Sequence, residues 1–189
     1  KSAVMTERWR LINGKELYDI QADPGQESNV ASANPQVVAQ LRDAYEQWWA
    51  SLSPVFDEHV RIVLGADEAN PTNFTCHDWH APQQQVPWHH GMIARNPEAN
   101  GYWMVEVREP GTYEFRLRMR PSSIVYGLPA GTAKVRVGDV EETAPVEANA
   151  PYASVTIELD AGPEKLQTWL DGEDGTSRGA YFVEARRVE

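Results

Sequence analysis

The chain has 189 residues, of which 17 are lysine or arginine and 28 are aspartate or glutamate, giving a formal net charge of −11. This acidic balance argues against nucleic acid as a partner, because a phosphate backbone attracts basic surfaces. No apolar run approaches the roughly 20 residues that a membrane-spanning helix needs, and the single cysteine rules out an internal disulfide.

The first predicted element is a β-hairpin. Asn13-Gly14 lies between two alternating segments, residues 4–12 and 16–20. Asn-Gly is the strongest short signal for a two-residue hairpin turn, because both turn positions need a positive φ. The apolar positions of the two strands include Trp9, Leu11 and Leu17.

A turn and a helix follow the hairpin. Asp23-Pro-Gly25 predicts a turn in which proline presets φ and glycine takes the left-handed position. Asn34-Pro35 predicts a helix start, with asparagine as the cap and proline at the first helical position. Ser53-Pro54 predicts the end of the helix. Helical spacing places one set of residues on a common apolar face: Val37, Val38, Leu41, Tyr45, Trp48 and Leu52.

This first segment resembles the region near the C-terminal end of sulfatases. The resemblance rests on Glu16-Leu-Tyr-Asp19, then Asp23-Pro-Gly25, then Asn29 and a helix. Sulfatases typically have ELYDL, a DPxE turn and an NL pair before the last helix. Gln26 replaces the usual glutamate and Val30 the usual leucine, and neither position is catalytic in the family. The alternative interpretation is a generic hairpin and helix.

The residues that carry sulfatase chemistry are missing from the sequence. Sulfatases use a formylglycine nucleophile made within a Cys/Ser-x-Pro-x-Arg motif, but Cys76 is followed by His-Asp-Trp-His. The early Asp-Asp pair that helps to hold the calcium ion of the family is also lacking. The resemblance therefore implies a non-catalytic C-terminal fragment, with residues 1–53 as a piece of the sulfatase C-terminal subdomain. Formylglycine and calcium would belong to the catalytic domain of a periplasmic or secreted parent that hydrolyses sulfate esters.

The second part of the chain, residues 54–189, has the pattern of an all-β domain. Short alternating segments are separated by glycine and proline, which predicts an antiparallel β-sandwich or jelly roll. The expected strands are residues 60–64, 73–79, 102–107, 112–119, 133–137, 154–159, 165–170 and 180–188. The predicted fold class is thus mostly β, with a short hairpin and helix followed by an accessory β-sandwich.

This β-rich part is similar to the extra domain appended to many bacterial arylsulfatases. The similarity is carried by five stretches: Cys76-His-Asp-Trp-His80, Val86-Pro-Trp-His89, Asn100-Gly-Tyr-Trp103, Gly111-Thr-Tyr-Glu-Phe-Arg-Leu-Arg118 and Arg178-Gly-Ala-Tyr-Phe-Val183. Arg120 stands where that domain usually has a tryptophan. An arylsulfatase-like or N-acetylgalactosamine-6-sulfatase-like parent fits equally well. The similarity implies that this domain docks on the catalytic domain and shapes substrate access.

A histidine-rich segment is the main candidate for ligand contact. The candidate residues are His77, Asp78, Trp79, His80, Trp88, His89, His90 and Trp103. One interpretation is a structural loop. A second is a contact surface in which His and Asp bond to sugar hydroxyls or sulfate while Trp stacks on the ring. A third is a metal site, which we do not expect, because His77 and His80 would point to opposite faces of a strand and zinc needs three or four converging ligands.

An independent carbohydrate-binding module is the alternative function. It would use Trp79, Trp88 and Trp103, and a sulfated carbohydrate is the expected ligand class. Arg116, Arg118 and Arg120 share one face of a predicted strand and form a second, weaker candidate, either an anion-binding row or a solvated face.

Overall fold

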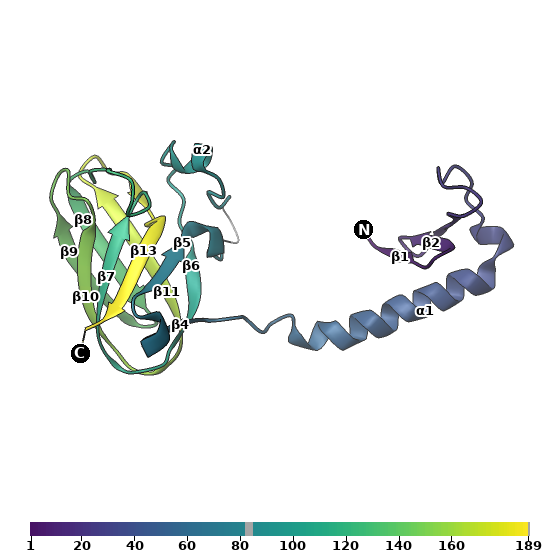
Figure 1. Cartoon of the computed structure of the whole chain (residues 1–189), viewed down its shortest axis with the longest axis horizontal. Coiled ribbons are helices and arrows are strands. Elements are labelled where there is room, and N and C mark those ends of the chain that lie inside the picture. The colour runs from purple at the N-terminus through teal and green to yellow at the C-terminus, as the bar shows by residue number, and fades with distance from the viewer. Residues whose placement is uncertain (82–84, 189) are drawn as a thin grey trace. The chain divides into compact units, whose positions relative to one another are not determined.

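The computed structural model describes residues 1–81 and 85–188, and the chain folds as two compact units, Lys1–His59 and Val60–Glu189 (Figure 1). The division expected at residues 53 and 54 lies just after the long helix, shortly before the observed boundary. The fold is mostly β, as predicted. Within the described residues the strands pair antiparallel, except that residues 62–64 pair parallel with residues 105–107, and one helix is long. Within the described residues, no helix combines the length and the apolar character needed to cross a membrane.

The first unit contains a three-stranded antiparallel sheet of β1 (Ala3–Met5), β2 (Trp9–Ile12) and β3 (Glu16–Asp19), in that order. Residues 4–12, expected as one strand, are therefore two strands. The hydroxyl of Thr6 accepts a hydrogen bond from the Trp9 N–H (2.9 Å), and the Thr6 N–H donates to the Trp9 carbonyl (2.8 Å). These local bonds close a turn that the alternating pattern alone does not reveal.

The Asn13-Gly14 turn forms as predicted in its backbone conformation. Asn13 has φ 49° and Gly14 has φ 66°, and the Lys15 N–H donates to the Ile12 carbonyl (2.9 Å). The register pairs Ile12 with Glu16, so the loop holds three residues rather than the predicted two. Arg42 donates from Nε to the Gly14 carbonyl (2.5 Å), which ties the helix to this turn.

The turn at Asp23 closes differently from the prediction. The left-handed residue is Gln26 (φ 56°) and not Gly25. The Gln26 N–H donates to the Asp23 carbonyl (3.0 Å), while the Gln26 amide oxygen accepts from Arg10 (3.0 Å). These two bonds favour the left-handed conformation at Gln26. The sequence pattern instead predicted that conformation for Gly25.

Helix α1 (Pro35–Leu52) begins and ends where the sequence predicts. Asn34 is the N-cap residue, but its side chain donates to the Val30 carbonyl (3.0 Å) instead of accepting from the helix. Val38 and Leu41 are buried against Leu11 and Leu17. The predicted apolar face is buried only near the start of the helix, since Trp48 remains 54% exposed.

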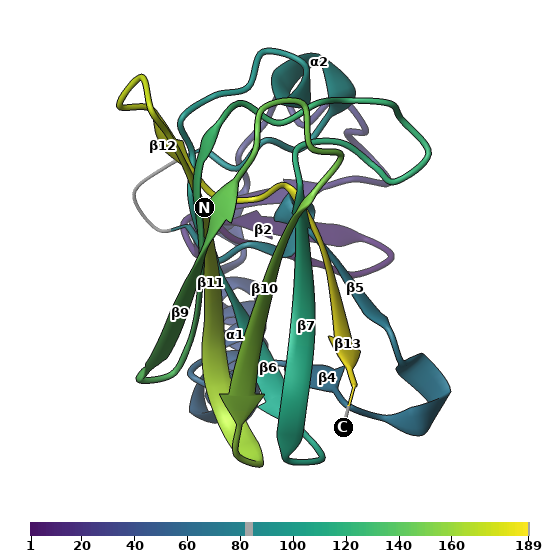
Figure 2. The same cartoon turned by 90° about the vertical axis from the view of Figure 1, so that its left-hand side faces the viewer.

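The second unit is a β-sandwich (Figure 2). One sheet has the order β10-β7-β13-β5, with β5 (Thr72–Thr75), β7 (Gly111–Arg118), β10 (Ala153–Leu159) and β13 (Phe182–Arg187). The other has the order β4-β6-β11-β8-β9, with β4 (Ile62–Leu64), β6 (Tyr102–Val107), β8 (Gly131–Val137), β9 (Val140–Val146) and β11 (Gly162–Gly172). β12 (Ser177–Arg178) pairs with β11, and α2 (His90–Ile93) is a single turn of helix.

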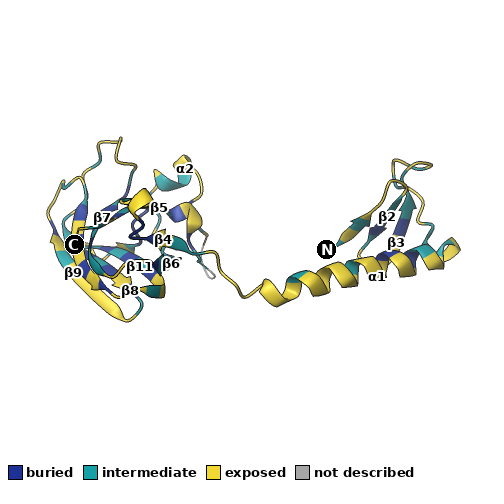
Figure 3. Cartoon of the chain, turned by 60° about the horizontal axis from the view of Figure 1, so that its bottom comes forward, coloured by how far each residue is buried: buried dark blue, intermediate teal, exposed yellow. Residues whose placement is uncertain are grey.

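The core of the sandwich lies between the two sheets (Figure 3). Strand β10 shows the expected alternation, because every second residue from Ala153 to Leu159 is buried. The largest fully buried side chains here include Phe74, Trp103, Tyr113, Phe115 and Tyr181. The inward positions predicted for β6 and β7 are confirmed, from Val105 to Leu117.

Two features of the sandwich differ from the predicted strands. Strand β9 was not expected, because Glu141, Glu142 and Pro145 have low strand propensity. It forms at the edge of its sheet, where charges and proline are tolerated. The strand expected at residues 73–79 ends at Thr75, and a short 3-10 helix at residues 76–78 turns Trp79 into the core.

Candidate functional site

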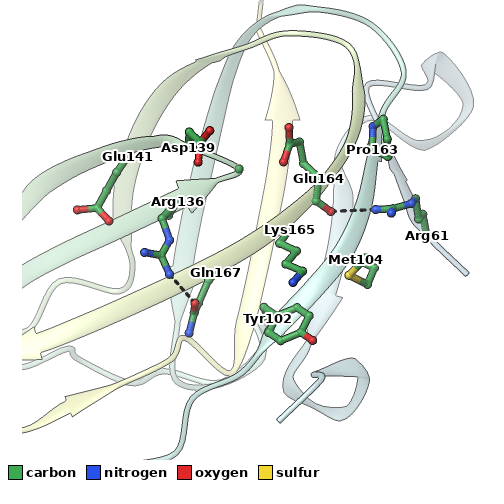
Figure 4. Close-up of a pocket in the computed structure, with 11 residues that line it drawn as sticks. Arg61, Tyr102, Met104, Arg136, Asp139, Glu141, Pro163, Glu164, Lys165 and Gln167 are labelled. Carbon is green, nitrogen blue, oxygen red and sulfur yellow. Dashed lines mark hydrogen bonds between the residues drawn. The ribbon is translucent and has the colours of Figure 1, made fainter. Parts of the chain in front are cut away.

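A groove of about 790 Å³ opens on the outer face of the six-stranded sheet (Figure 4). It is built from β6, β11, β8 and the β8–β9 turn, and all of its lining belongs to the second unit. The lining residues are Arg61, Tyr102, Met104, Arg136, Gly138, Asp139, Glu141, Pro163, Glu164, Lys165 and Gln167. Its volume falls in the range of small-molecule sites, roughly 300–1,000 Å³.

The strand register brings the side chains of the groove into cross-strand rows. Gln167 of β11 lies opposite Tyr102 of β6 on one side and opposite Arg136 of β8 on the other. Arg136 in turn lies opposite Glu141 of β9. Because side chains alternate across a sheet, and Leu166 and Thr168 are buried between the sheets, this row faces outward. Lys165 precedes Gln167 by two residues and shares its face.

Three cations at this face lie over aromatic rings. The Lys165 ammonium is 5.0 Å from the centroid of the Tyr102 ring. Lys134 Nζ and Arg136 Cζ lie 4.3 Å and 4.9 Å from the centroid of the Trp169 ring. Each distance is within the range of a cation–π interaction, which restrains these flexible side chains. Arg136 also donates to the amide oxygen of Gln167 (3.0 Å).

The groove is lined by both cations and carboxylates. Figure 4 shows Asp139, Glu141 and Glu164 around the β8–β9 turn, away from Tyr102 and Gln167. Lys134 is 3.9 Å from Glu141, at the outer limit of an ion pair. Arg61 is held by the backbone, since its Nη1 donates to the carbonyls of Val105 and Glu164, each at 3.2 Å. The groove therefore offers cationic donors and carboxylate acceptors side by side.

The lining of the groove is mostly polar or charged. Its lining, among the residues that the structure describes, contains no serine, cysteine or histidine that could form a nucleophile–base pair. It supplies an aromatic ring, an amide, two arginines, a lysine and three carboxylates. Such a set can both donate to and accept from a polar ligand.

Two of the tryptophans predicted to contact ligand are buried in the core. Trp103 is fully buried and donates from Nε1 to the Thr75 carbonyl (2.9 Å). Trp79 packs edge-on against Trp103 (5.7 Å between centroids) and Tyr181 (5.9 Å). Neither indole can stack on an external sugar ring, so these two assignments are corrected. Both are part of the core because the 3-10 helix after β5 directs Trp79 inward and β6 directs Trp103 inward.

The remaining members of the histidine-rich segment are spread over several elements. Trp88 is 59% exposed, with its ring edge-on to His89 (4.8 Å). His89 accepts the Gly91 N–H at Nδ1 (3.1 Å) and caps α2, whose first residue is the exposed His90. His77 and Asp78 lie exposed in the 3-10 helix, where Asp78 accepts from the Thr75 hydroxyl (3.2 Å).

His80 connects this segment to the groove. It forms an isolated β-bridge with Tyr102, and its ring stacks on the Tyr102 ring (5.4 Å, 15° between planes). His80 therefore touches a residue that lines the groove at the sheet face. In residues 1–81 and 85–188, no three His, Cys, Asp or Glu side chains are grouped as metal ligands would be.

Cys76 is a buried thiol. Its Sγ donates to the Pro87 carbonyl (3.1 Å), and burial raises the pKa of the thiol to about 11. A thiol in this environment stays protonated at neutral pH and is a poor nucleophile.

The predicted arginine row begins on β7 of the other sheet, where Arg116 is paired with carboxylates. Arg116 pairs with Glu114 (2.9 Å) and Glu184 (3.5 Å), and its hydrogen bond lowers the pKa of the Glu114 carboxyl. Arg116 and Arg118 lie over Tyr152, at 5.2 Å and 4.7 Å. Arg120 instead contacts the ring of Tyr126 (4.5 Å). The three arginines do not converge on one site.

Sequence reasoning missed the cations of the groove, although their signal was present. Lys134-Val-Arg136 and Lys165-Leu-Gln-Thr-Trp169 alternate polar with apolar residues, so period two places the polar ones on the outer face. What the pattern does not give is the order of strands, which sets β11 between β6 and β8.

No protein-family model and no curated protein matches this sequence. Solved structures with partial similarity include a ruminal GH26 endo-β-1,4-mannanase, at 13% identity and a TM-score of 0.40, covering 63% of this chain and 26% of that one. A Podospora anserina GH26-CBM35 β-(1,4)-mannanase has 9% identity and a TM-score of 0.38, covering 64% of this chain and 28% of that one. A Bacillus subtilis protein has 15% identity and a TM-score of 0.30, covering 47% of this chain and 22% of that one. The chain thus spans about a quarter of each neighbour's length, and the similarity is too low to inform its function.

Proposed function

We propose that the β-sandwich of the second unit is a non-catalytic carbohydrate-binding module whose site is the groove on the six-stranded sheet. The observation that carries the proposal is the mixed lining of this groove, with donors at Arg136 and Gln167 and acceptors at Asp139 and Glu141. A sugar hydroxyl both donates and accepts hydrogen bonds, so a hydroxyl-rich ligand matches such a lining. Waters that bridge such a polar groove and its ligand would lower the desolvation cost of binding, because they complete the hydrogen bonds.

The test is a titration of the whole chain against a glycan panel, followed by variants of the groove. Gln167→Ala removes the amide at the centre of the cross-strand row and should weaken binding of any glycan that the chain takes up. Trp88→Ala is the matched control, because Trp88 is the exposed tryptophan of the histidine-rich segment. Loss of binding in the Trp88 variant with none in the Gln167 variant would place the site elsewhere and refute the groove.

A second candidate function concerns the first unit. We propose that residues 1–53 are the C-terminal subdomain piece of a sulfatase and dock on its catalytic domain. Support comes from the motif residues, which fold as strand β3, the turn at Asp23 and helix α1. A further observation is an exposed aromatic group on this unit, in which Trp49 stacks on Tyr45 (6.0 Å) and meets Phe56 edge-on (5.0 Å). Exposed apolar surface of this kind marks interaction sites.

In such a parent, formylglycine and calcium would carry out sulfate-ester hydrolysis in the catalytic domain, and the β-sandwich would shape access of the substrate. The gene sequence upstream of Lys1 is the direct test. A reading frame that continues upstream with a Cys/Ser-x-Pro-x-Arg motif is expected. A complete gene without that motif would refute the sulfatase assignment and leave the carbohydrate-binding proposal standing.

A further inference from the structure

We propose that the groove on the six-stranded sheet takes a neutral oligosaccharide, with Arg136 and Glu141 binding two adjacent hydroxyl groups of one sugar. This inference rests on the proposed carbohydrate-binding function and names the ligand class of the same site. It is carried by the balance of charge along the lining, by the contacts that the cations already make, and by the register between β8 and β9.

The first observation is the charge of the lining. Among the residues that the structure describes, the groove is lined by three cations and three carboxylates, so its formal charge is zero. The rest of the chain therefore holds the whole net charge of −11, and its field repels an anionic ligand. A neutral sugar meets no such repulsion. The ligand class thus differs from the sulfated carbohydrate expected from the sequence.

The second observation is that the cations of the groove are held by separate partners. Arg61 Nη1 donates to two backbone carbonyls, each at 3.2 Å. Arg136 Nη2 donates to the amide oxygen of Gln167 (3.0 Å), and the Lys165 ammonium lies 5.0 Å from the centroid of the Tyr102 ring. A guanidinium has five N–H donors, so Arg136 keeps donors for a hydroxyl group beside Gln167.

The third observation is the pairing of a donor with an acceptor. Arg136 of β8 lies directly opposite Glu141 of β9, and both face outward because Val135 and Val137 beside Arg136 are buried. Directly opposed residues have their Cβ atoms roughly 4.5–5.5 Å apart, so the two side chains are close neighbours. Figure 4 shows both on the same side of the sheet, with Gln167 on the next strand.

Adjacent hydroxyl groups on a sugar ring match this pair. One hydroxyl accepts from the Arg136 guanidinium while its neighbour donates to the Glu141 carboxylate. Both bonds are charge-assisted, which makes them stronger than hydrogen bonds between neutral groups. A sulfate or carboxylate group on a ligand has acceptors only, so it would leave Glu141 facing a like charge. The pair therefore favours a diol over an anion.

Ring stacking contributes less than these hydrogen bonds. Tyr102 is the aromatic residue in the described lining of the groove. His80 stacks on its ring, at 5.4 Å and 15° between planes, and Lys165 lies over the same ring. Much of the ring surface is thus already in contact with this chain, and a sugar is recognised chiefly through its hydroxyl groups.

The experiment is a calorimetric titration of the whole chain at low and moderate salt. The neutral probes are maltohexaose, cellohexaose, mannohexaose and xylohexaose, and the anionic probes are a chondroitin sulfate hexasaccharide and a galacturonic acid hexamer. We expect a neutral hexasaccharide to bind most tightly. Its affinity should change by less than about twofold with salt, because salt screens interactions between charges and this ligand carries none.

Variants of the pair test its role with the tightest neutral probe. Arg136→Met and Glu141→Ala should each weaken binding by about tenfold, the size expected for loss of one charge-assisted hydrogen bond. Both residues are exposed, so the fold should survive, as melting temperatures will show. The direction of the Glu141 effect is decisive, because removing a carboxylate would strengthen the binding of an anion. Unchanged or tighter binding in Glu141→Ala would overturn the pair.

Each variant has a matched control. Glu142→Ala removes the next carboxylate of β9, whose residue lies opposite buried Val135 and so belongs to the other face of the strand. Arg186→Met removes an exposed arginine from β13 of the four-stranded sheet. Both controls should leave the affinity unchanged. A loss in them equal to that in the groove variants would mean that net charge alone matters, which would overturn the assignment to Arg136 and Glu141.

The remaining outcomes separate the two proposals. Tighter binding of either anionic probe than of every neutral one would overturn the neutral ligand class while leaving carbohydrate binding in place. Failure of every member of the wider glycan panel would refute the proposed function, and this inference with it.

Discussion

Replacing Gly179 with alanine should destabilise the sandwich by steric overlap alone. A Cβ at this position would lie 2.6 Å from Cζ2 and 2.8 Å from Cη2 of Trp79. Gly179 has no positive φ, so the backbone tolerates alanine and the effect comes from steric overlap, chiefly with the indole. The ring is buried between Trp103 and Tyr181 and has little room to move. Overpacking of a close-packed core costs about 1–3 kcal/mol, and we expect the upper half of that range.

The assay is chemical denaturation of the two forms, with a double-mutant cycle as the refuting test. Trp79→Phe removes the two ring atoms that the new methyl group meets, so Gly179→Ala should cost less in that background, by at least about 1 kcal/mol. The contact with Asn100 Oδ1, 2.8 Å from the position of the new methyl group, keeps the cost above zero. An equal cost in both backgrounds would show that the overlap with Trp79 is not the cause.

Three further predictions concern other parts of the chain. Gly14→Ala should destabilise the first unit by about 1 kcal/mol, because φ is +66° there; thermal melting of that unit measures the loss, and no change would contradict the turn geometry. Cys76 should react with a thiol reagent at pH 8 only after denaturant is added, since its raised pKa keeps the thiol protonated; rapid labelling of the folded chain would contradict its burial. The pKa of Asp19 lies below its usual value because of its hydrogen bond from Arg8, so the stability from this pair is present above the unfolded pKa and is lost as pH falls through the folded one. NMR titration of Asp19 should show that pKa rising in Arg8→Gln, and an unchanged value would exclude the pair as the cause.

The sequence predicts local structure well where one strong signal decides it. The Asn13-Gly14 turn follows from residues that tolerate a positive φ, and the start of α1 at Pro35 and its end at Leu52 follow from the fixed φ of nearby prolines. The inward positions of β6 and β7 follow from alternation, since burial of one sheet face fixes the register.

What the sequence does not predict depends on contacts between distant segments. Trp79 and Trp88 are both tryptophans in a polar neighbourhood, yet only Trp79 is buried. Its burial depends on the absence of side chains at Gly101 and Gly179, where a Cβ would come within 2.7 Å and 2.6 Å of it. The groove likewise requires the strand order β6-β11-β8, which brings Tyr102 beside Gln167 from a position far away in the chain.

The composition of strand β9 also disfavours pairing between the sheet edges of two copies of the sandwich. A sheet edge offers unpaired backbone groups to any strand that approaches, and pairing between such edges is the first step of many aggregation routes. At this edge, Pro145 has no N–H to contribute to a new ladder, and the exposed Glu141 and Glu142 place like charges against an identical edge. The residues that give β9 its low strand propensity are therefore expected to oppose edge-to-edge association of the sandwich at high concentration.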